Sequence, residues 1–175
     1  MARRRCAVLG ATGLVGQRLQ QRLINHPWFE LAAVVGSSES AGKRLSQLPW
    51  RLDEERPESL DIKVIYSGDM NLISQLMKQK IQFIFSALPR AIAATMEESL
   101  AQAGFQVFSN SSHHRRQDGI PLIIADLNPN HMLHYRGQNY HEQHHDEQHR
   151  NGAKRNGSLA CSTNCTVIPV ALPLK

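Results

Sequence analysis

The chain opens with Arg4-Arg5-Cys6-Ala7-Val8-Leu9-Gly10-Ala11-Thr12-Gly13-Leu14-Val15-Gly16, and this stretch decides the fold. Its apolar run predicts a buried strand over residues 4–10, and the apolar stripe that follows predicts a helix over 13–25. A second apolar run, residues 31–35, ends at Gly36. A strand, a glycine loop, a helix and a second strand in this order predict a βαβ unit.

The alternation continues along the chain. Further strands are predicted at 62–66, 82–86, 106–109, 122–125 and 158–161, helices at 70–80 and 90–103, and a loop at 42–60. This order predicts an α/β fold, a Rossmann-type doubly wound parallel sheet. We expect a nucleotide-binding domain over 1–136, a polar His-rich loop over 137–157, and the start of a catalytic or dimerisation domain over 158–175.

Composition narrows the class of protein. The 175 residues are 41% hydrophobic, enough for one domain with a real core, and no run approaches the roughly 18 to 20 apolar residues of a membrane span. The N-terminal arginines lack the apolar stretch of a secretory signal, so we expect a cytoplasmic protein. The net charge of +5 fits ordinary solubility or attraction of phosphate groups. No nucleic-acid-binding motif is present, so neither nucleic acid nor membrane is expected as a partner.

The glycine loop predicts a dinucleotide site. Gly10-x-x-Gly13-x-x-Gly16 follows a strand and opens a helix, so its backbone can approach a pyrophosphate while the helix start offers free N–H groups. Enzymes that use NAD place an acidic residue about 20 residues on. Here residues 36–44 read Gly-Ser-Ser-Glu-Ser-Ala-Gly-Lys-Arg, whose hydroxyls and basic pair suit a 2′-phosphate and therefore NADP. Glu39 is the one acidic residue in this segment and does not fit a 2′-phosphate site. The alternative interpretation of the segment is a polar loop with no role in binding.

A thiol near the C-terminal end predicts covalent catalysis. Asn164-Cys165-Thr166 lies where a strand is expected to give way to a helix, and a helix N-terminus lowers a thiol pKa and offers N–H groups to an oxyanion. Cys161, in the strand before it, is the alternative nucleophile, and Cys6 is expected in the core. Three cysteines argue against a disulfide scaffold.

Histidines raise two further questions. His141, His144, His145 and His149 have a spacing that could bind a metal, but their segment is so polar that we interpret it as a solvated loop and expect no metal site. A general base is also needed for aldehyde chemistry. His113 and His114 are the candidates within the chain, although we expect the base to lie beyond Lys175.

Together these motifs resemble the aspartate-semialdehyde dehydrogenase family. The similarity rests on six segments in the same order: residues 10–16, 37–43, 86–89, 109–115, 120–129 and 164–166. It implies that Cys165 is the catalytic nucleophile, that Asn164 and Arg115 bind substrate, with Arg116 as a neighbouring possibility for its phosphate, and that NADP is the cofactor. The implied cofactor-binding residues are Gly10, Thr12, Gly13, Leu14, Val15, Gly16, Ser37, Ser38, Ser40, Lys43, Ser86, Ala87, Leu88 and Asn110.

The resemblance implies a reaction as well as a site. Members reduce L-aspartyl-4-phosphate to the semialdehyde through a cysteine thioester, a step that feeds lysine, threonine and methionine synthesis, and they work as homo-oligomers. The similarity covers only the N-terminal half of a typical member, and the family's catalytic His and its Arg for the substrate carboxylate lie in the other half. We therefore expect the isolated chain to bind NADP weakly and to have little activity.

Three alternatives stay open. Acetylglutamyl-phosphate reductases have Gly before the cysteine and Tyr after it, unlike Asn164 and Thr166. Glyceraldehyde-3-phosphate dehydrogenases share the Cys161-Ser-Thr-Asn-Cys165 pattern, with the first cysteine as nucleophile, but their glycine loop differs. A non-catalytic dinucleotide-binding fragment is the third. The sequence departs from the family pattern at Ser162-Thr163, where Asn-Pro is frequent, and at Pro169 and Pro173, which fall in the expected catalytic helix.

Overall fold

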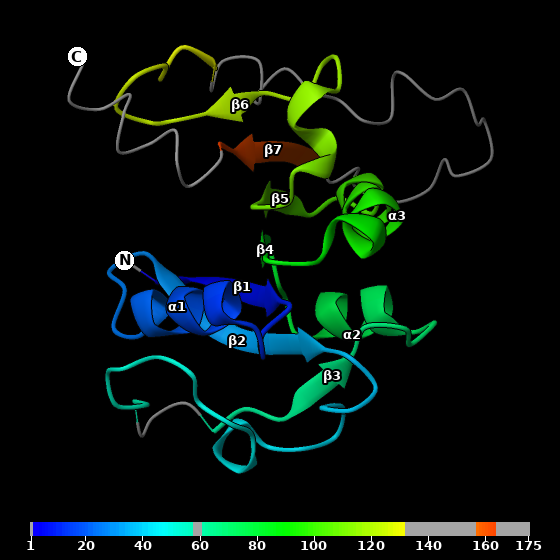
Figure 1. Ribbon diagram of the computed structural model, residues 1–175. Coiled ribbons are helices and arrows are strands. Elements are labelled where there is room, and N and C mark those ends of the chain that lie inside the picture. Colours follow the sequence, from blue (N-terminus) through cyan, green and yellow to red (C-terminus); the bar gives the residue numbers. More distant parts are fainter. Residues whose placement is uncertain (1, 58–60, 132–156, 164–175) are drawn as a thin grey trace. The chain divides into compact units, whose positions relative to one another are not determined.

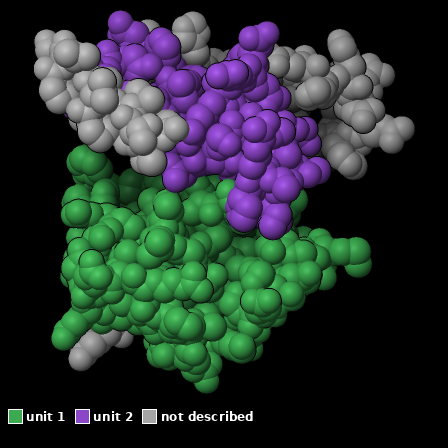
Figure 2. Space-filling model, in the orientation of Figure 1, with its two compact units in different colours: residues 1–88 green, residues 89–175 purple. Residues whose placement is uncertain are grey.

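The computed structural model describes residues 2–57, 61–131 and 157–163. The chain divides into two compact units, unit 1 (residues 1–88) and unit 2 (residues 89–175), which Figure 2 shows in green and purple. Each unit has its own strands and its own buried side chains.

Unit 1 is the predicted βαβ unit extended by two more strands (Figure 1). Its elements are β1 (Arg4–Leu9), α1 (Leu14–Leu23), β2 (Phe29–Gly36), the 3-10 turn η1 (Leu45–Gln47), β3 (Val64–Tyr66), α2 (Leu72–Lys78) and β4 (Phe83–Ser86). The strands run parallel in the order β3-β2-β1-β4, with β1 between β2 and β4. The carboxyl ends of β1, β2 and β4 therefore meet at one edge of the sheet.

The core of unit 1 follows from the apolar runs. Four consecutive residues of β1, residues 6–9, are fully buried, so both faces of that strand are covered, as expected for a parallel sheet. One apolar cluster comprises Cys6, Val8, Ala11, Leu23, Val34, Leu45 and Val64. Leu19 and Ile24 pack against this cluster, so the apolar stripe of the first helix meets the sheet as its period predicts.

The described part of unit 2 begins with a long helix, and its last strand lies between two others. Its elements are α3 (Arg90–Gln102), β5 (Gln106–Ser109), the 3-10 turn η2 (His113–Arg116), β6 (Leu122–Ile123) and β7 (Ser158–Ser162). All three strands are parallel, in the order β5-β7-β6 (Figure 1). Cys161 on β7 pairs with Ser109 on one side and Leu122 on the other.

These elements confirm the predicted α/β class and parallel sheet and correct several details. β2 begins at Phe29, two residues earlier than expected, and β6 spans only two residues because Asn128 folds back on it: its side chain accepts from the Ile124 N–H at 2.7 Å and donates to the Leu122 carbonyl at 2.8 Å. The turns η1 and η2 lie in segments for which no helix was predicted.

Other expectations lie outside the described residues. These are the structure of the His-rich stretch up to residue 156 and the helix expected after Cys165. The three-part division at 136 and 157 stays a prediction, although β7, placed there at the start of a new domain, pairs with β5 and β6. Within the described part of the chain, no helix is long and apolar enough to cross a membrane.

Candidate functional site

The glycine loop between β1 and α1 is shaped by two positions that cannot hold a side chain. Gly10 has a φ of +69°, and a Cβ there would lie 2.5 Å from the Ala87 carbonyl oxygen. A Cβ at Gly16 would meet the Gly10 carbonyl oxygen and lie 2.9 Å from the Ala11 Cα. The loop thus folds tightly onto the first turn of α1 and onto the segment after β4.

Gly13 differs from these two glycines. Its φ of −78° suits any residue, and a Cβ there would lie 3.5 Å from the nearest atom, an ordinary contact. It is the N-cap of α1, and no side chain caps the helix there. Leu14 and Val15 follow it with 55% and 46% of their surfaces exposed. The N-terminus of α1 is accordingly open, with room for a ligand to approach its N–H groups.

Two buried glutamines of α1 donate hydrogen bonds to carbonyl groups of the loop. Their sequence did not predict this role. The Gln17 amide donates to the carbonyls of Thr12 at 3.2 Å and Pro49 at 2.9 Å. The Gln20 amide donates to the Ala11 carbonyl at 2.6 Å. Both side chains lie on the first two turns of α1, so the helix that would receive a phosphate also fixes the loop. The signal that could have predicted this role is Gln20, a polar residue on the buried side of the helix four residues after the last glycine of the loop.

The segment after β2, residues 37–44, is polar, and some of its side chains are exposed to solvent while that of Ser40 is buried. Ser37, Ser38 and Lys43 are exposed, as the prediction of a 2′-phosphate contact requires. Ser40 is 4% exposed, and its hydroxyl donates to the Ser37 carbonyl at 3.0 Å, so it shapes the turn. Arg44 is paired with Asp61 at 3.2 Å, and the pKa of Asp61 is lowered by hydrogen bonds from Ser46 and by this guanidinium.

The segment after β4 lies against the glycine loop. The Ala87 N–H donates to the Leu9 carbonyl at 3.0 Å, and Gly10 is in close contact with Ala87. Ser86 and Leu88 are 1% and 7% exposed. Three of the predicted cofactor-binding segments, residues 10–16, 37–43 and 86–88, therefore lie at the ends of strands of unit 1, at the carboxyl edge of its sheet. In open parallel sheets this is the edge at which ligands bind. Asn110, the remaining predicted cofactor-binding residue, belongs to unit 2.

Arg115 links three segments of unit 2. Its Nε donates to the Ser162 carbonyl at 3.0 Å, and one terminal nitrogen donates to the Asn110 carbonyl at 3.0 Å. The Ser162 hydroxyl also donates to the Asn110 side-chain oxygen at 2.6 Å. Ser162 is the last residue of β7, just before Asn164 and Cys165. The predicted substrate arginine and Asn110 thus hold the end of the strand that leads to the predicted nucleophile.

The cysteines differ in their capacity to form a thiolate. Cys161 is 2% exposed, and burial together with the Glu97 carboxylate raises its pKa to about 12. Cys6 is fully buried, and burial with the Glu30 carboxylate likewise raises its pKa to about 12. Because the thiolate is the nucleophile, neither is suited to attack a substrate near neutral pH. Cys165 and Asn164, the predicted nucleophile and its neighbour, lie outside the described residues.

The two candidate bases in η2 occupy different surroundings. His114 is fully buried: its Nε2 faces Glu97 at 3.3 Å and the Ala93 carbonyl at 3.4 Å, and its Nδ1 faces Gln117 at 2.8 Å. Burial opposes protonation of this ring, but its hydrogen bonds with Glu97 and Gln117 leave the pKa raised. With both ring nitrogens bound inside unit 2, His114 has a structural role. His113 beside it is partly exposed.

Comparison with known proteins identifies the family. Residues 5–135 match the protein family described as “Semialdehyde dehydrogenase, NAD binding domain”. The chain belongs to this semialdehyde dehydrogenase family. Unit 1 falls within the match from Arg5, the second residue of β1, onward, and so does unit 2 from α3 to β6.

Several members of the semialdehyde dehydrogenase family are similar in sequence. An aspartate-semialdehyde dehydrogenase of Archaeoglobus fulgidus is 37% identical over 71% of this chain and 35% of its own length. The Aspergillus fumigatus enzyme of that name is 31% identical over 98% of this chain and 43% of its own length. The crystal structure titled as aspartate semialdehyde dehydrogenase with NADP from Candida albicans has a TM-score of 0.81 and 32% identity, covering 99% of this chain and 46% of that one. The chain thus spans less than half the length of these relatives.

Proposed function

We propose that this chain is the dinucleotide-binding part of an NADP-dependent aspartate-semialdehyde dehydrogenase. The observation that carries the proposal is the glycine loop, in which Gly10 and Gly16 leave no room for side chains at the open N-terminus of α1. The shared name of the similar proteins from Archaeoglobus and Aspergillus supports the choice of aspartyl phosphate as substrate. The reaction belongs to amino-acid synthesis in the cytoplasm.

The residues present fit a bound dinucleotide. The first turn of α1 would hold the pyrophosphate through its N–H groups, and Gly13 leaves space for that approach. Ser37, Ser38 and Lys43 would hold the 2′-phosphate, because they are exposed after β2 and no carboxylate ends that strand. Ser40 supports this loop through its bond to Ser37. When bound, the dinucleotide supplies the hydride that reduces the acyl group.

The chain's own residues account for the covalent part of the reaction. The Cys165 thiolate attacks the acyl carbon of aspartyl-4-phosphate, the carbon–oxygen bond to phosphate breaks, and phosphate leaves to give a thioester on the sulfur. After reduction of that carbon, the carbon–sulfur bond breaks and the semialdehyde leaves. Arg115 contributes by binding the phosphate and, through the Ser162 carbonyl, by fixing the approach to Cys165. Asn164 lies beside the sulfur in sequence and orients the substrate.

A titration with NADPH and NADH tests the proposal. We expect NADPH to bind saturably and NADH at least tenfold more weakly, followed by the fluorescence of the reduced nicotinamide and by the melting temperature. The matched variant is Ser37→Asp, which places a carboxylate where the 2′-phosphate would lie and should reverse the preference. Equal binding of the two dinucleotides, or none, would contradict the assignment of the cofactor.

A further inference from the structure

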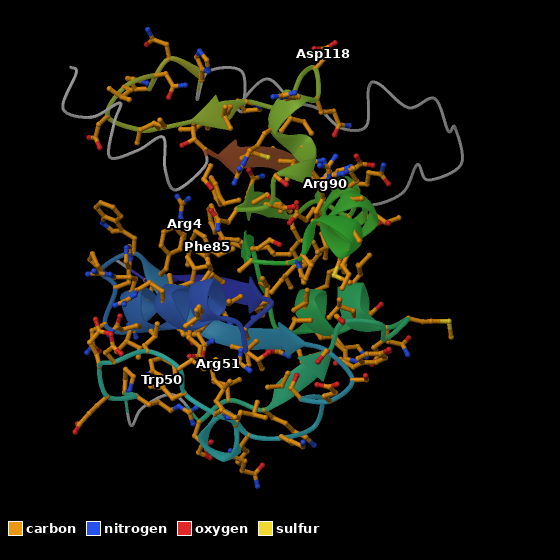
Figure 3. All side chains as sticks on the ribbon, viewed as in Figure 1. Arg4, Trp50, Arg51, Phe85, Arg90 and Asp118 are labelled. Carbon is orange, nitrogen blue, oxygen red and sulfur yellow. The ribbon has the colours of Figure 1, made fainter. Side chains whose placement is uncertain are left out.

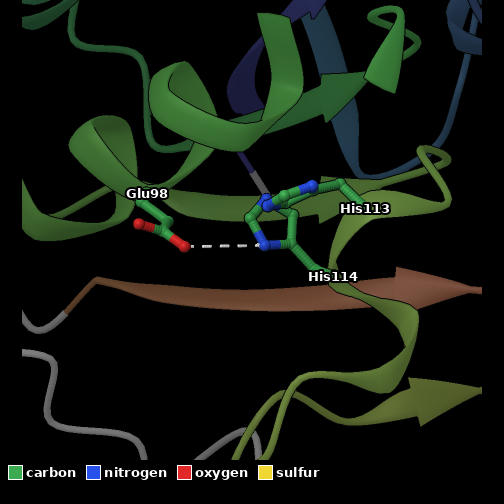
Figure 4. Close-up of side chains that lie close together, drawn as sticks. All are labelled: Glu98, His113 and His114. Atoms are coloured by element: carbon green, nitrogen blue, oxygen red, sulfur yellow. Dashed lines mark ion pairs between the residues drawn. The ribbon is translucent and has the colours of Figure 1, made fainter. Parts of the chain in front are cut away.

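A second cluster of side chains lies in unit 2, on α3 and on η2, and the proposed reaction uses none of its three side chains. Glu98 on α3 and His113 and His114 on η2 each offer one ligand atom, and these atoms all lie within 4.8 Å of one another. Figure 4 shows the Glu98 carboxylate facing the His114 ring, with 3.7 Å between Glu98 Oε1 and His114 Nδ1. Glu98 and His113 are partly exposed, so an ion has access from solvent.

Glu97 sets the orientation of the buried histidine. Its carboxylate is fully buried and lies 3.3 Å from His114 Nε2. With Nε2 directed at this carboxylate, the nitrogen that faces Glu98 is Nδ1, and Nδ1 is therefore the nitrogen placed to bind a metal ion. Metal-binding histidines usually donate their second ring N–H to a carboxylate or carbonyl in this way. The adjacent glutamates of α3 thus reach the two nitrogens of one imidazole.

Gln117 occupies the position between the ligand atoms. Its side-chain oxygen lies 2.8 Å from His114 Nδ1, and its amide donates to Glu98 Oε1 at 3.2 Å. Because Gln117 is exposed, its side chain can rotate into solvent and leave both atoms to a metal ion. Gln117 thus bridges the carboxylate and the imidazole at the place where an ion would sit.

We propose that Glu98, His113 and His114 form a binding site for a divalent transition metal ion of the Zn²⁺ type. Two imidazole nitrogens and one carboxylate are a common ligand set for this ion, with water as the fourth ligand. Bound metal would join α3 to η2, the turn that carries Arg115. This site lies outside the chemistry proposed above and does not depend on it.

The test uses zinc alone and removes the competing histidines first. In a background with His141, His144, His145 and His149 all changed to Gln, we expect Zn²⁺ to bind with a stoichiometry of one by titration calorimetry. Glu98→Gln and His113→Gln should each lower the affinity at least tenfold. Glu55→Gln, an exposed glutamate of unit 1, is the matched control and should leave binding unchanged.

A third variant separates metal binding from simple packing. Glu97→Gln keeps the size of the buried side chain but removes its charge, and should weaken zinc binding about 10- to 100-fold. Circular dichroism and the melting temperature without metal establish that each variant is folded, and Co²⁺ absorption reports on the ligand geometry. Zinc affinity that is unchanged in folded Glu98→Gln and His113→Gln, or zinc binding only by the stretch that includes residues 141–149, would overturn the proposal.

Discussion

The two units build their candidate sites by different means. In unit 1 the glycine loop owes its shape to close backbone contacts at Gly10 and Gly16 and to the neutral amides of Gln17 and Gln20. In unit 2 ionisable side chains hold the candidate site together. Glu97 faces His114 in the interior, and the Arg115 side chain donates to the Ser162 carbonyl. Figure 3 shows the side chains of both units on the ribbon.

This difference predicts different sensitivities. A site shaped by the absence of side chains is lost when a methyl group is added, and responds little to charge. A site held by buried ionisable groups tolerates small changes of shape and is lost when one partner is removed.

The thiols should differ most strongly. At pH 8, Cys6 and Cys161, each with a pKa of about 12, should react with iodoacetamide about a thousandfold more slowly than an ordinary exposed thiol. We expect Cys165 to account for all rapid labelling, measured by mass spectrometry of peptides. Cys165→Ser should abolish that labelling, whereas rapid labelling of Cys161 would return the role of nucleophile to that residue.

Removing the partner of Glu97 from the interior of unit 2 should lower the stability. His114→Leu leaves the buried Glu97 facing an apolar side chain, and the expected loss in free energy of unfolding is about 3–5 kcal/mol. Urea denaturation measures it. Glu98→Gln, whose carboxylate is one-third exposed, is the matched control and should change stability by less than about 1 kcal/mol. A loss that is equal in both variants would show that the interior pair is not the cause.

Adding a methyl group separates the glycines of unit 1. Gly16→Ala should lower the free energy of unfolding by about 1–3 kcal/mol, since the new Cβ meets backbone atoms of Gly10 and Ala11. Gly13→Ala should be nearly neutral for stability, because its Cβ has an ordinary contact. Thermal unfolding of the two variants measures the difference. A greater loss of stability in Gly13→Ala than in Gly16→Ala would contradict the steric account of the loop.

The smallest effect concerns one exposed cation. Lys43→Gln removes a charge from the loop after β2 and should weaken NADPH binding up to about tenfold, or about 1.4 kcal/mol, without changing NADH binding or stability. Parallel titrations at low and high salt measure it, and the difference should shrink at high salt. Lys78→Gln, at the end of α2, is the control. An equal loss for both dinucleotides would assign Lys43 a structural role.

The sequence was sufficient for the parts that depend on local pattern. The apolar runs and the glycine spacing predicted β1, α1 and β2 and the loop between them because these elements are consecutive in the chain. The same pattern could not distinguish Gly13, which is sterically free, from Gly10 and Gly16, because their contacts come from Ala87 and from the fold of the loop itself.

The parts that depend on distant pairing were not predictable. Arg115 meets Ser162 across 47 residues, and only the insertion of β7 between β5 and β6 brings them together. The burial of Glu97 and His114 could not be predicted either, because both are polar residues and nothing in their local sequence marks them as interior positions. His114 was a candidate base by residue type alone, whereas its buried contacts show a structural role.

Hydrogen–deuterium exchange with and without NADPH tests the central claim most directly. If unit 1 holds the dinucleotide at the carboxyl edge of its sheet, NADPH should slow exchange in residues 10–16, 37–43 and 86–88 and leave α2 unchanged. Slower exchange confined to other segments, or no change at saturating NADPH, would contradict the account.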